Sequence, residues 1–182
     1  SVFYGMRHDF AWASIKDNLN ALNNYSRRWR DSTLSTGAVI HPVSFWDLFA
    51  NYSQGFRVPA ISEINSFNSD LNATIEPEKS DSYEIGTRLR YKDLSQLKTS
   101  LFLIDINDEI VFDSTQLTAA NPFGRNLNAG KTRRYGVENR LDVTPISEFS
   151  GYGSYTWMKG IIVEAPLSGM PFNDRELGQI PQ

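Results

Sequence analysis

The chain has 182 residues, a formal net charge of −3, 40% hydrophobic residues and 13% aromatic residues. This charge argues against a dedicated nucleic-acid binder, which would carry a clustered basic surface, and the lack of cysteine excludes disulfides and thiolate metal sites. No apolar run approaches the ~18 residues of a membrane helix, and the mean hydropathy is −0.40. Strands of a membrane β-barrel have equally low hydropathy, because half of their side chains face a polar interior.

Several segments alternate between apolar and polar residues with a period of two, which is typical of β-strands. In residues 80–91, Tyr83 and Leu89 fall on one face, and Glu84 and Arg88 fall on the other. This segment has the length of a tilted strand that crosses a bilayer, ~9–11 residues, and is longer than a typical strand of about 5–6 residues. The predicted strands are 2–13, 33–41, 45–56, 80–91, 97–112, 131–144 and 148–163.

The connections between these strands alternate between long and short. The long polar connections are 14–32, 57–79, 113–130 and the final segment 164–182, and the short turns are 42–44, 92–96 and 145–147. Up-and-down membrane barrels alternate in this way, with short periplasmic turns and longer external loops. The pattern predicts an all-β, antiparallel up-and-down meander of about seven long strands with one apolar and one polar face.

Several motifs resemble those of TonB-dependent outer-membrane receptors. Residues 52–59, YSQGFRVP, resemble the family signature YSxGFRxP, and residues 102–110, FLIDINDEI, resemble FxIDIxDxI. Residues 128–138, NAGKTRRYGVE, are similar to the strand entry NAGxxxxxGVE, and residues 178–181, GQIP, resemble the start of a loop exit. The motifs follow the order of the family and cover nearly the whole chain.

The resemblance implies an open fragment of a barrel of about 22 strands that surrounds a plug. We therefore expect residues 1–182 to be a partial barrel domain without plug or TonB box, cut from a longer chain at both ends. The implied location is the Gram-negative outer membrane, and the implied function is TonB-coupled import of a scarce ligand, most often a ferric siderophore. The implied partners are the TonB complex, reached through the missing plug, outer-membrane lipid and lipopolysaccharide. No enzyme activity and no cofactor are implied, and haem, cobalamin or a glycan are alternative ligands.

Cationic and aromatic residues of the predicted external loops are the candidate ligand contacts, because they suit an anionic iron complex. These residues are Arg27, Arg28, Trp29, Arg30, Arg57 and Arg125. For residues 27–30, the alternative is a solvated loop or a contact with lipopolysaccharide. For Arg57, together with Glu78, the alternative is a structural role in returning the loop to the next strand.

Charges of both signs on the polar faces are predicted to face the lumen, where they can pair across strands or with a plug. They are Arg7, Asp9, Asp47, Glu84, Arg88, Arg90, Asp105, Glu109, Arg134, Glu138, Arg140 and Asp142. In residues 97–112 we place Phe102 and Ile104 on the apolar face, which puts Asp105 on the polar face. His8 and His41 do not stand at ligand spacing, so no metal site is predicted.

Two other classes of protein remain open. A passive porin-type channel would have a constriction loop and no dependence on energy coupling. A soluble β-domain that acts as a binding module would bury the apolar faces, such as Tyr135, Val137 and Leu141, beneath another layer of the same chain.

Overall fold

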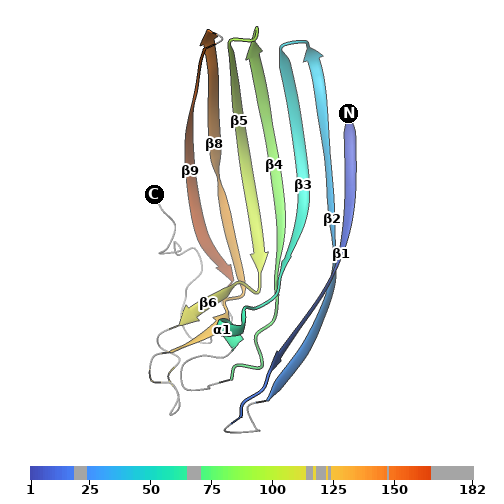
Figure 1. Ribbon diagram of the computed structural model, residues 1–182, viewed down its shortest axis with the longest axis vertical. Helices are drawn as coiled ribbons and strands as arrows, with labels where there is room; N and C mark the ends of the chain where they lie inside the picture. The colour runs from blue at the N-terminus through green and yellow to red at the C-terminus, as the bar shows by residue number, and fades with distance from the viewer. Residues whose placement is uncertain are drawn as a thin grey trace.

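The computed structural model of the chain describes residues 1–18, 24–64, 71–113, 117, 122, 124–146 and 148–164. The fold is nearly all-β, and its long strands form one seven-stranded sheet (Figure 1). The strands of this sheet are β1 Val2–Ile15, β2 Tyr25–Val43, β3 Trp46–Arg57, β4 Glu78–Tyr91, β5 Ser95–Asn107, β8 Lys131–Ile146 and β9 Phe149–Glu164.

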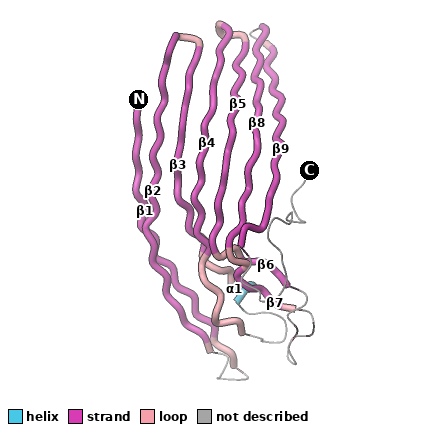
Figure 2. The backbone as a smooth tube through the Cα atoms, turned by 180° about the vertical axis from the view of Figure 1, so that it is seen from behind, coloured by secondary structure: helices cyan, strands magenta, loops and turns pink. Residues whose placement is uncertain are grey.

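The sheet is an open up-and-down meander. Its order is β1-β2-β3-β4-β5-β8-β9, and each strand is antiparallel to the next. The short turns that join β2 to β3, β4 to β5 and β8 to β9 lie at one end, and the longer connections lie at the other (Figure 2). The predicted topology and the predicted alternation of connections are therefore confirmed. No helix in the described part of the chain is long and apolar enough to cross a membrane.

A small second layer lies at the end with the long connections. It consists of the short helix α1 Ile61–Ile64 and a hairpin of β6 Ile110–Asp113 and β7 Arg125–Asn128. The predicted strand 97–112 is therefore wrong beyond Asn107. Asp108 adopts a left-handed conformation with φ 56°, which turns the chain out of the sheet.

Strand β2 begins earlier than predicted. The expected loop 14–32 is wrong over most of its length, because residues 25–32 pair with β1 in continuous register. Polar and charged residues occupy both faces of this part of β2, so its sequence lacks the apolar alternation that identified the other strands. As a result, β1 and β2 project beyond the rest of the sheet (Figure 1).

Residues directly opposite each other in neighbouring strands share a face. One such row runs Ala50, Ile85, Leu101, Val137 and Trp157 across five strands. We call the face with this row the outer face and the opposite one the inner face. Ile85 is 61% exposed and Leu101 is 58% exposed, so no second layer of the described chain covers the outer face. This exposure contradicts the expectation for a soluble binding module.

The register corrects one assignment of faces. Leu101 stands opposite Ile85 and Val137 on the outer face, so Asp105 also lies on the outer face and Phe102 lies on the inner face. The prediction that Asp105 faces the lumen is therefore wrong. Asp105 instead accepts hydrogen bonds from Arg133 on the outer face, at 2.6 and 2.8 Å.

Tyrosines mark one boundary of the outer apolar surface. Tyr52 stands opposite Tyr83, and Tyr135 occupies the corresponding place in β8. At the end with the short turns, Trp46 and Tyr91 lie on the same face. Aromatic girdles at both borders of an outward apolar band are typical of transmembrane barrels.

Candidate functional site

The predicted ligand contacts at residues 27–30 lie in strand β2 and divide between its two faces. Arg27 and Trp29 point to the inner side, and Arg28 and Arg30 point to the outer side, because successive side chains of a strand alternate. The structure therefore does not bring these four residues into one patch. Their contact with a ligand stays a prediction.

Arg27 fastens β2 to the segment that precedes β4. Its guanidinium donates hydrogen bonds to the carbonyl oxygens of Ala73 and Ile75, at 3.4 and 3.1 Å, and to Glu76 Oε1 at 2.5 Å. The same guanidinium lies 5.7 Å from the centre of the Trp29 ring. These contacts hold the part of β2 that extends past its pairing with β3 against the segment that precedes β4.

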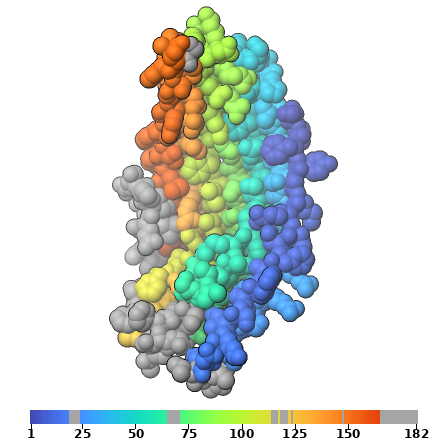
Figure 3. All heavy atoms as spheres, viewed as in Figure 1, coloured from blue at the N-terminus to red at the C-terminus, as the bar shows by residue number. Residues whose placement is uncertain are grey.

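Trp29 belongs to a small apolar cluster between β2 and α1. Trp29 is 7% exposed, and it packs with Tyr25 and Ile64, which is fully buried. In Figure 3 the region of α1 lies between β6 on one side and the projecting ends of β1 and β2 on the other. The cluster is the principal apolar core in the described part of the chain, and it lies outside the apolar band of the sheet.

Arg57 links three segments at the same end of the molecule. It donates to both carboxylate oxygens of Glu78, each at 2.6 Å, and to Glu63 at 3.0 and 3.1 Å. Glu63 also accepts from the amide of Ala60 at 2.6 Å, and Glu78 accepts from the amide of Ile110 at 2.7 Å. These contacts fit the structural role considered for Arg57 and Glu78, in which the two residues fix where the connection 57–79 returns to β4.

The ionised form of Glu78 is favoured by its partners. Glu78 lies beyond Tyr83 on β4, outside the apolar band. Burial acts to raise the pKa of its carboxyl group, but the hydrogen bonds from Arg57 and the Ile110 amide outweigh burial and lower it. The carboxylate of Glu78 is therefore negatively charged when it accepts these hydrogen bonds in the folded protein.

Asparagines join the segment before β4 to the β6–β7 hairpin. Asn72 donates to the carbonyl oxygen of Asn126 at 2.6 Å. Asn128 donates to the carbonyl oxygens of Glu76 and Asp108, at 2.9 and 2.6 Å, and accepts from the amide of Glu76 at 2.9 Å. The sequence pattern does not indicate these roles, although Asn128 opens one of the family-like motifs.

Arg125, the last of the predicted ligand contacts, lies at the start of β7 opposite Asp113. The six predicted contacts therefore occupy separate places. Arg27, Trp29 and Arg57 hold the loops together, Arg28 and Arg30 lie on the outer face, and Arg125 lies on the hairpin.

The inner face carries a buried carboxylate near the short turns. Asp47 is 2% exposed. It accepts hydrogen bonds from Arg90 at 2.5 and 2.8 Å, shares one with His41 Nδ1 at 2.7 Å, and lies 3.6 Å from Arg88. Two guanidinium groups therefore compensate one carboxylate and leave positive charge on the inner face.

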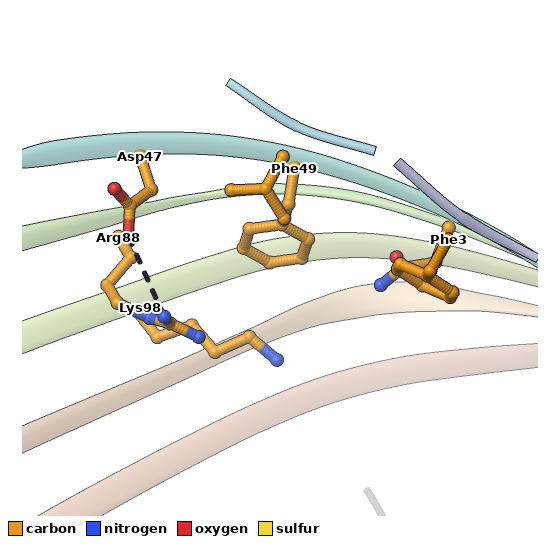
Figure 4. Close-up of a pocket in the computed structure, with 7 residues that line it drawn as sticks. Phe3, Asp47, Phe49, Arg88 and Lys98 are labelled. Atoms are coloured by element: carbon orange, nitrogen blue, oxygen red, sulfur yellow. Dashed lines mark ion pairs between the residues drawn. The ribbon is translucent and has the colours of Figure 1, made fainter. Parts of the chain in front are cut away.

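A hollow of about 220 Å³ lies beside this carboxylate (Figure 4). Its lining is Phe3, Val39, Asp47, Phe49, Asn51, Arg88 and Lys98. Lys98 lies 3.2 Å from Glu84 and 5.0 Å from the centre of the Phe49 ring. Arg88 and Lys98 can attract an anionic group, and the rings of Phe3 and Phe49 offer apolar contact beside it.

The other predicted lumen charges on the inner face are mostly paired within the wall. The pairs are Arg7 with Asp9 at 2.7 Å, Arg134 with Glu109 at 2.6 Å and Arg140 with Asp142 at 2.7 Å. Glu138 stands opposite Thr156 on the same face. Their exposure to a lumen stays a prediction.

Metal ligation has no candidate in the ranges that the structure describes, where no three His, Asp or Glu side chains converge as metal ligands would. His8 shares a hydrogen bond with Ser32 at 2.6 Å, and His41 is bonded to Asp47.

The open sheet with an apolar outer face and loops gathered at one end defines a piece of a transmembrane barrel wall. The sequence model of the family described as TonB dependent receptor-like, beta-barrel, matches residues 1–182, so the chain belongs to this family. Its members are transport receptors of the Gram-negative outer membrane, not enzymes.

Known proteins agree with this assignment. The chain is 26% identical over 156 residues to the hemoglobin and hemoglobin-haptoglobin-binding protein A of Haemophilus influenzae, covering 75% of this chain and 14% of that protein. Its fold is similar to that of the copper transporter OprC, with a TM-score of 0.73, 19% identity and coverage of 99% of this chain and 28% of OprC.

A further similar structure is the hemophore receptor HasR of Serratia marcescens. Its TM-score is 0.62 with 19% identity, and the match covers 86% of this chain and 29% of HasR. The ferric-catecholate import receptor Fiu of E. coli has a TM-score of 0.58 with 23% identity, over 78% of this chain and 20% of Fiu. The chain therefore spans less than a third of each of these proteins, and these low identities establish the fold alone.

Proposed function

We propose that this chain forms part of the wall of an outer-membrane receptor that imports a ferric siderophore with energy coupled through TonB. The observation that carries the proposal is the two-faced sheet. Its outer face is apolar and is not covered by the described part of the chain across five strands, and its inner face carries paired charges. A wall of this kind separates lipid from a polar lumen.

The loop junction around Arg57 supports a receptor rather than an open pore. Arg57, Glu63 and Glu78 join segments that are far apart in the sequence, and the asparagine contacts add the β6–β7 hairpin. Such cross-linking gives the external end a fixed shape, and a preorganised surface loses less entropy when it binds a ligand. The cationic hollow beside Asp47 would suit an anionic group in the lumen.

Two of the similar proteins support iron as the proposed cargo, whereas OprC is a copper transporter. Fiu is a ferric-catecholate import receptor, and HasR is a receptor for a hemophore. Haem is the second candidate cargo, because the relative from Haemophilus influenzae binds hemoglobin and matches this chain at 26% identity.

The test uses a strain that lacks the full-length receptor carrying this segment. We expect growth on a ferric catecholate as sole iron source to need both the receptor and TonB. Growth on haem alone would assign the cargo to haem. Growth that needs the receptor but not TonB would contradict the proposal and favour a passive channel.

A further inference from the structure

A row of three cations crosses the inner face near the short turns. Arg88 on β4 stands opposite Lys98 on β5, and Lys98 stands opposite Arg140 on β8. Like charges that stand directly opposite each other in a sheet are destabilising. Residues placed in this way have Cβ atoms about 4.5–5.5 Å apart, so the head groups of Arg88 and Lys98 can reach one shared anion.

Arg88 has a poorly satisfied guanidinium group. Among the described residues its ion pair is with Asp47, at 3.6 Å, which is beyond hydrogen-bond distance. Asp47 bonds instead to Arg90, at 2.5 and 2.8 Å, and to His41. The Nε atom of Arg88 is buried and has no hydrogen-bond partner in the described part of the chain. A buried donor without an acceptor is unfavourable, and a bound water or ion is one way to satisfy it.

Lys98 has donor capacity beyond the bond that it forms. An ammonium group carries three N–H donors. In the described part of the chain, Lys98 donates to Glu84 at 3.2 Å, and Glu84 also accepts from Asn51 at 3.0 Å. The ammonium group of Lys98 can therefore donate to a further acceptor without giving up Glu84.

The charges around the hollow do not balance. In the described ranges, three cations are paired with two carboxylates there, and these groups are Arg88, Arg90, Lys98, Asp47 and Glu84. Arg140 belongs to a separate group, because it does not line the hollow and pairs with Asp142 at 2.7 Å. One further negative charge beside Arg88 and Lys98 would balance the group.

The hollow of about 220 Å³ provides room for such an anion and places apolar surface beside it. In Figure 4 the side chains of Arg88 and Lys98 extend from neighbouring strands to the same side of the sheet as the rings of Phe3 and Phe49. Aromatic rings offer apolar contact to carbon atoms. A short organic anion with a single charge fits this lining better than an inorganic dianion, because it uses both the cations and the rings.

Resting on the proposed function, which turns the inner face toward the lumen, we propose that Arg88 and Lys98 bind the carboxylate group of an organic acid. The rings of Phe3 and Phe49 contact the carbon atoms of that acid. Hydrogen bonds from guanidinium and ammonium groups to a carboxylate are charge-assisted and strong. Two sources can supply the group, which are a small free anion in the lumen and an acidic side chain from the part of the receptor outside this chain.

The experiment uses the full-length receptor purified in mild detergent, with difluoroacetate as the probe observed by fluorine NMR. Difluoroacetamide is the neutral counterpart of this short carboxylate. The variant Arg88→Gln/Lys98→Gln removes both cations that line the hollow. The matched control is Arg140→Gln, which removes the third cation of the same row, outside the lining. A crystal structure of the full-length receptor shows which group lies against Arg88 and Lys98.

For a free anion, we expect the wild type to bind difluoroacetate about tenfold more tightly than Arg88→Gln/Lys98→Gln does. Arg140→Gln should bind the probe like the wild type, and difluoroacetamide should not bind. For a side chain of the receptor, we expect the wild type to exclude the probe and the crystal structure to show an Asp or Glu oxygen within about 3.2 Å of Arg88 or Lys98. Substitution of that acid by its amide should then allow difluoroacetate to bind.

Two results would overturn the proposal. One is equal binding of difluoroacetate by the wild type and Arg88→Gln/Lys98→Gln, both shown to be folded by heat-modifiable gel migration. The other is a receptor that does not bind the probe and whose crystal structure holds no carboxylate against Arg88 or Lys98.

These outcomes are separate from those of the transport test. Growth on a ferric catecholate that needs the receptor and TonB, together with a hollow that takes no carboxylate, contradicts only the anion site. A protein that does not fractionate with the outer membrane contradicts the proposed function itself.

Discussion

Phe102 on β5 lies over Gly136 on β8, directly opposite it on the inner face. A Cβ atom added at Gly136 would lie 2.8 Å from Phe102 Cζ and 2.1 Å from the carbonyl oxygen of Trp157. The same relationship joins Phe49 to Gly86. A ring laid over a glycine of the next strand fills the space that the missing side chain leaves and helps to fix the register.

Substitution of Gly136 by alanine should therefore destabilise the barrel. The new methyl group meets a backbone carbonyl that cannot move without disturbing the β8–β9 ladder, and such overpacking costs about 1–3 kcal/mol. The measurement is the free energy of unfolding of the full-length receptor in urea. Gly153→Ala is the control, because a Cβ at Gly153 meets nothing within 4 Å. Equal stability of the two variants would show that the Phe102–Gly136 contact does not constrain the sheet.

A charged residue substituted on the outer face should destabilise the membrane-inserted protein. Leu141 is 46% exposed on this face, and an arginine on the lipid side costs ~2–4 kcal/mol at the midplane and less near the borders. We expect Leu141→Arg to reduce the folded, membrane-inserted fraction measured by heat-modifiable gel migration. Thr156→Arg, which stands opposite Glu138 on the inner face, should be tolerated. Tolerance of both substitutions would contradict the assignment of the outer face to lipid.

The sequence was sufficient for the order of the strands and the alternation of their connections, because each depends on local patterns. The sequence was not sufficient to predict which side chains of β5 lie on the outer face and which on the inner face. Leu101, Phe102, Leu103 and Ile104 are apolar in succession, so their periodicity does not say which side meets lipid. Only the pairing of Leu101 with Ile85 decides it.

The candidate site was less predictable than the sheet. Arg27 looks like a loop residue in the sequence, and its contacts with Ala73 and Ile75 join positions almost fifty residues apart. Such contacts depend on how long connections fold against one another, which local patterns do not encode. The pairing of Arg57 with Glu78 was foreseeable, because the residues flank one long connection between adjacent strands.

Loss of the Glu78 carboxylate should loosen the β6–β7 hairpin. In Glu78→Gln, the bidentate ion pair with Arg57 is lost and the amide of Ile110 keeps a weaker acceptor. We expect the Ile110 amide of the full-length receptor to exchange with deuterium about tenfold faster at neutral pH. Asp142→Asn is the control, because its pair with Arg140 is more exposed and contributes little. An unchanged exchange rate in Glu78→Gln would show that the loop junction is held by other contacts.

Acid should weaken the same junction. The pKa of Glu78 is lower in the folded protein than its ordinary value, because its hydrogen bonds with Arg57 and Ile110 outweigh burial. A lowered folded-state pKa stabilises the protein above the ordinary glutamate pKa of about 4.3, and this contribution is lost as the pH falls through the folded value. We therefore expect wild type to melt at a higher temperature than Glu78→Gln at pH 7, with the difference shrinking below about pH 4. A difference in melting temperature that stays constant down to pH 3 would mean that the charge of Glu78 does not stabilise the junction.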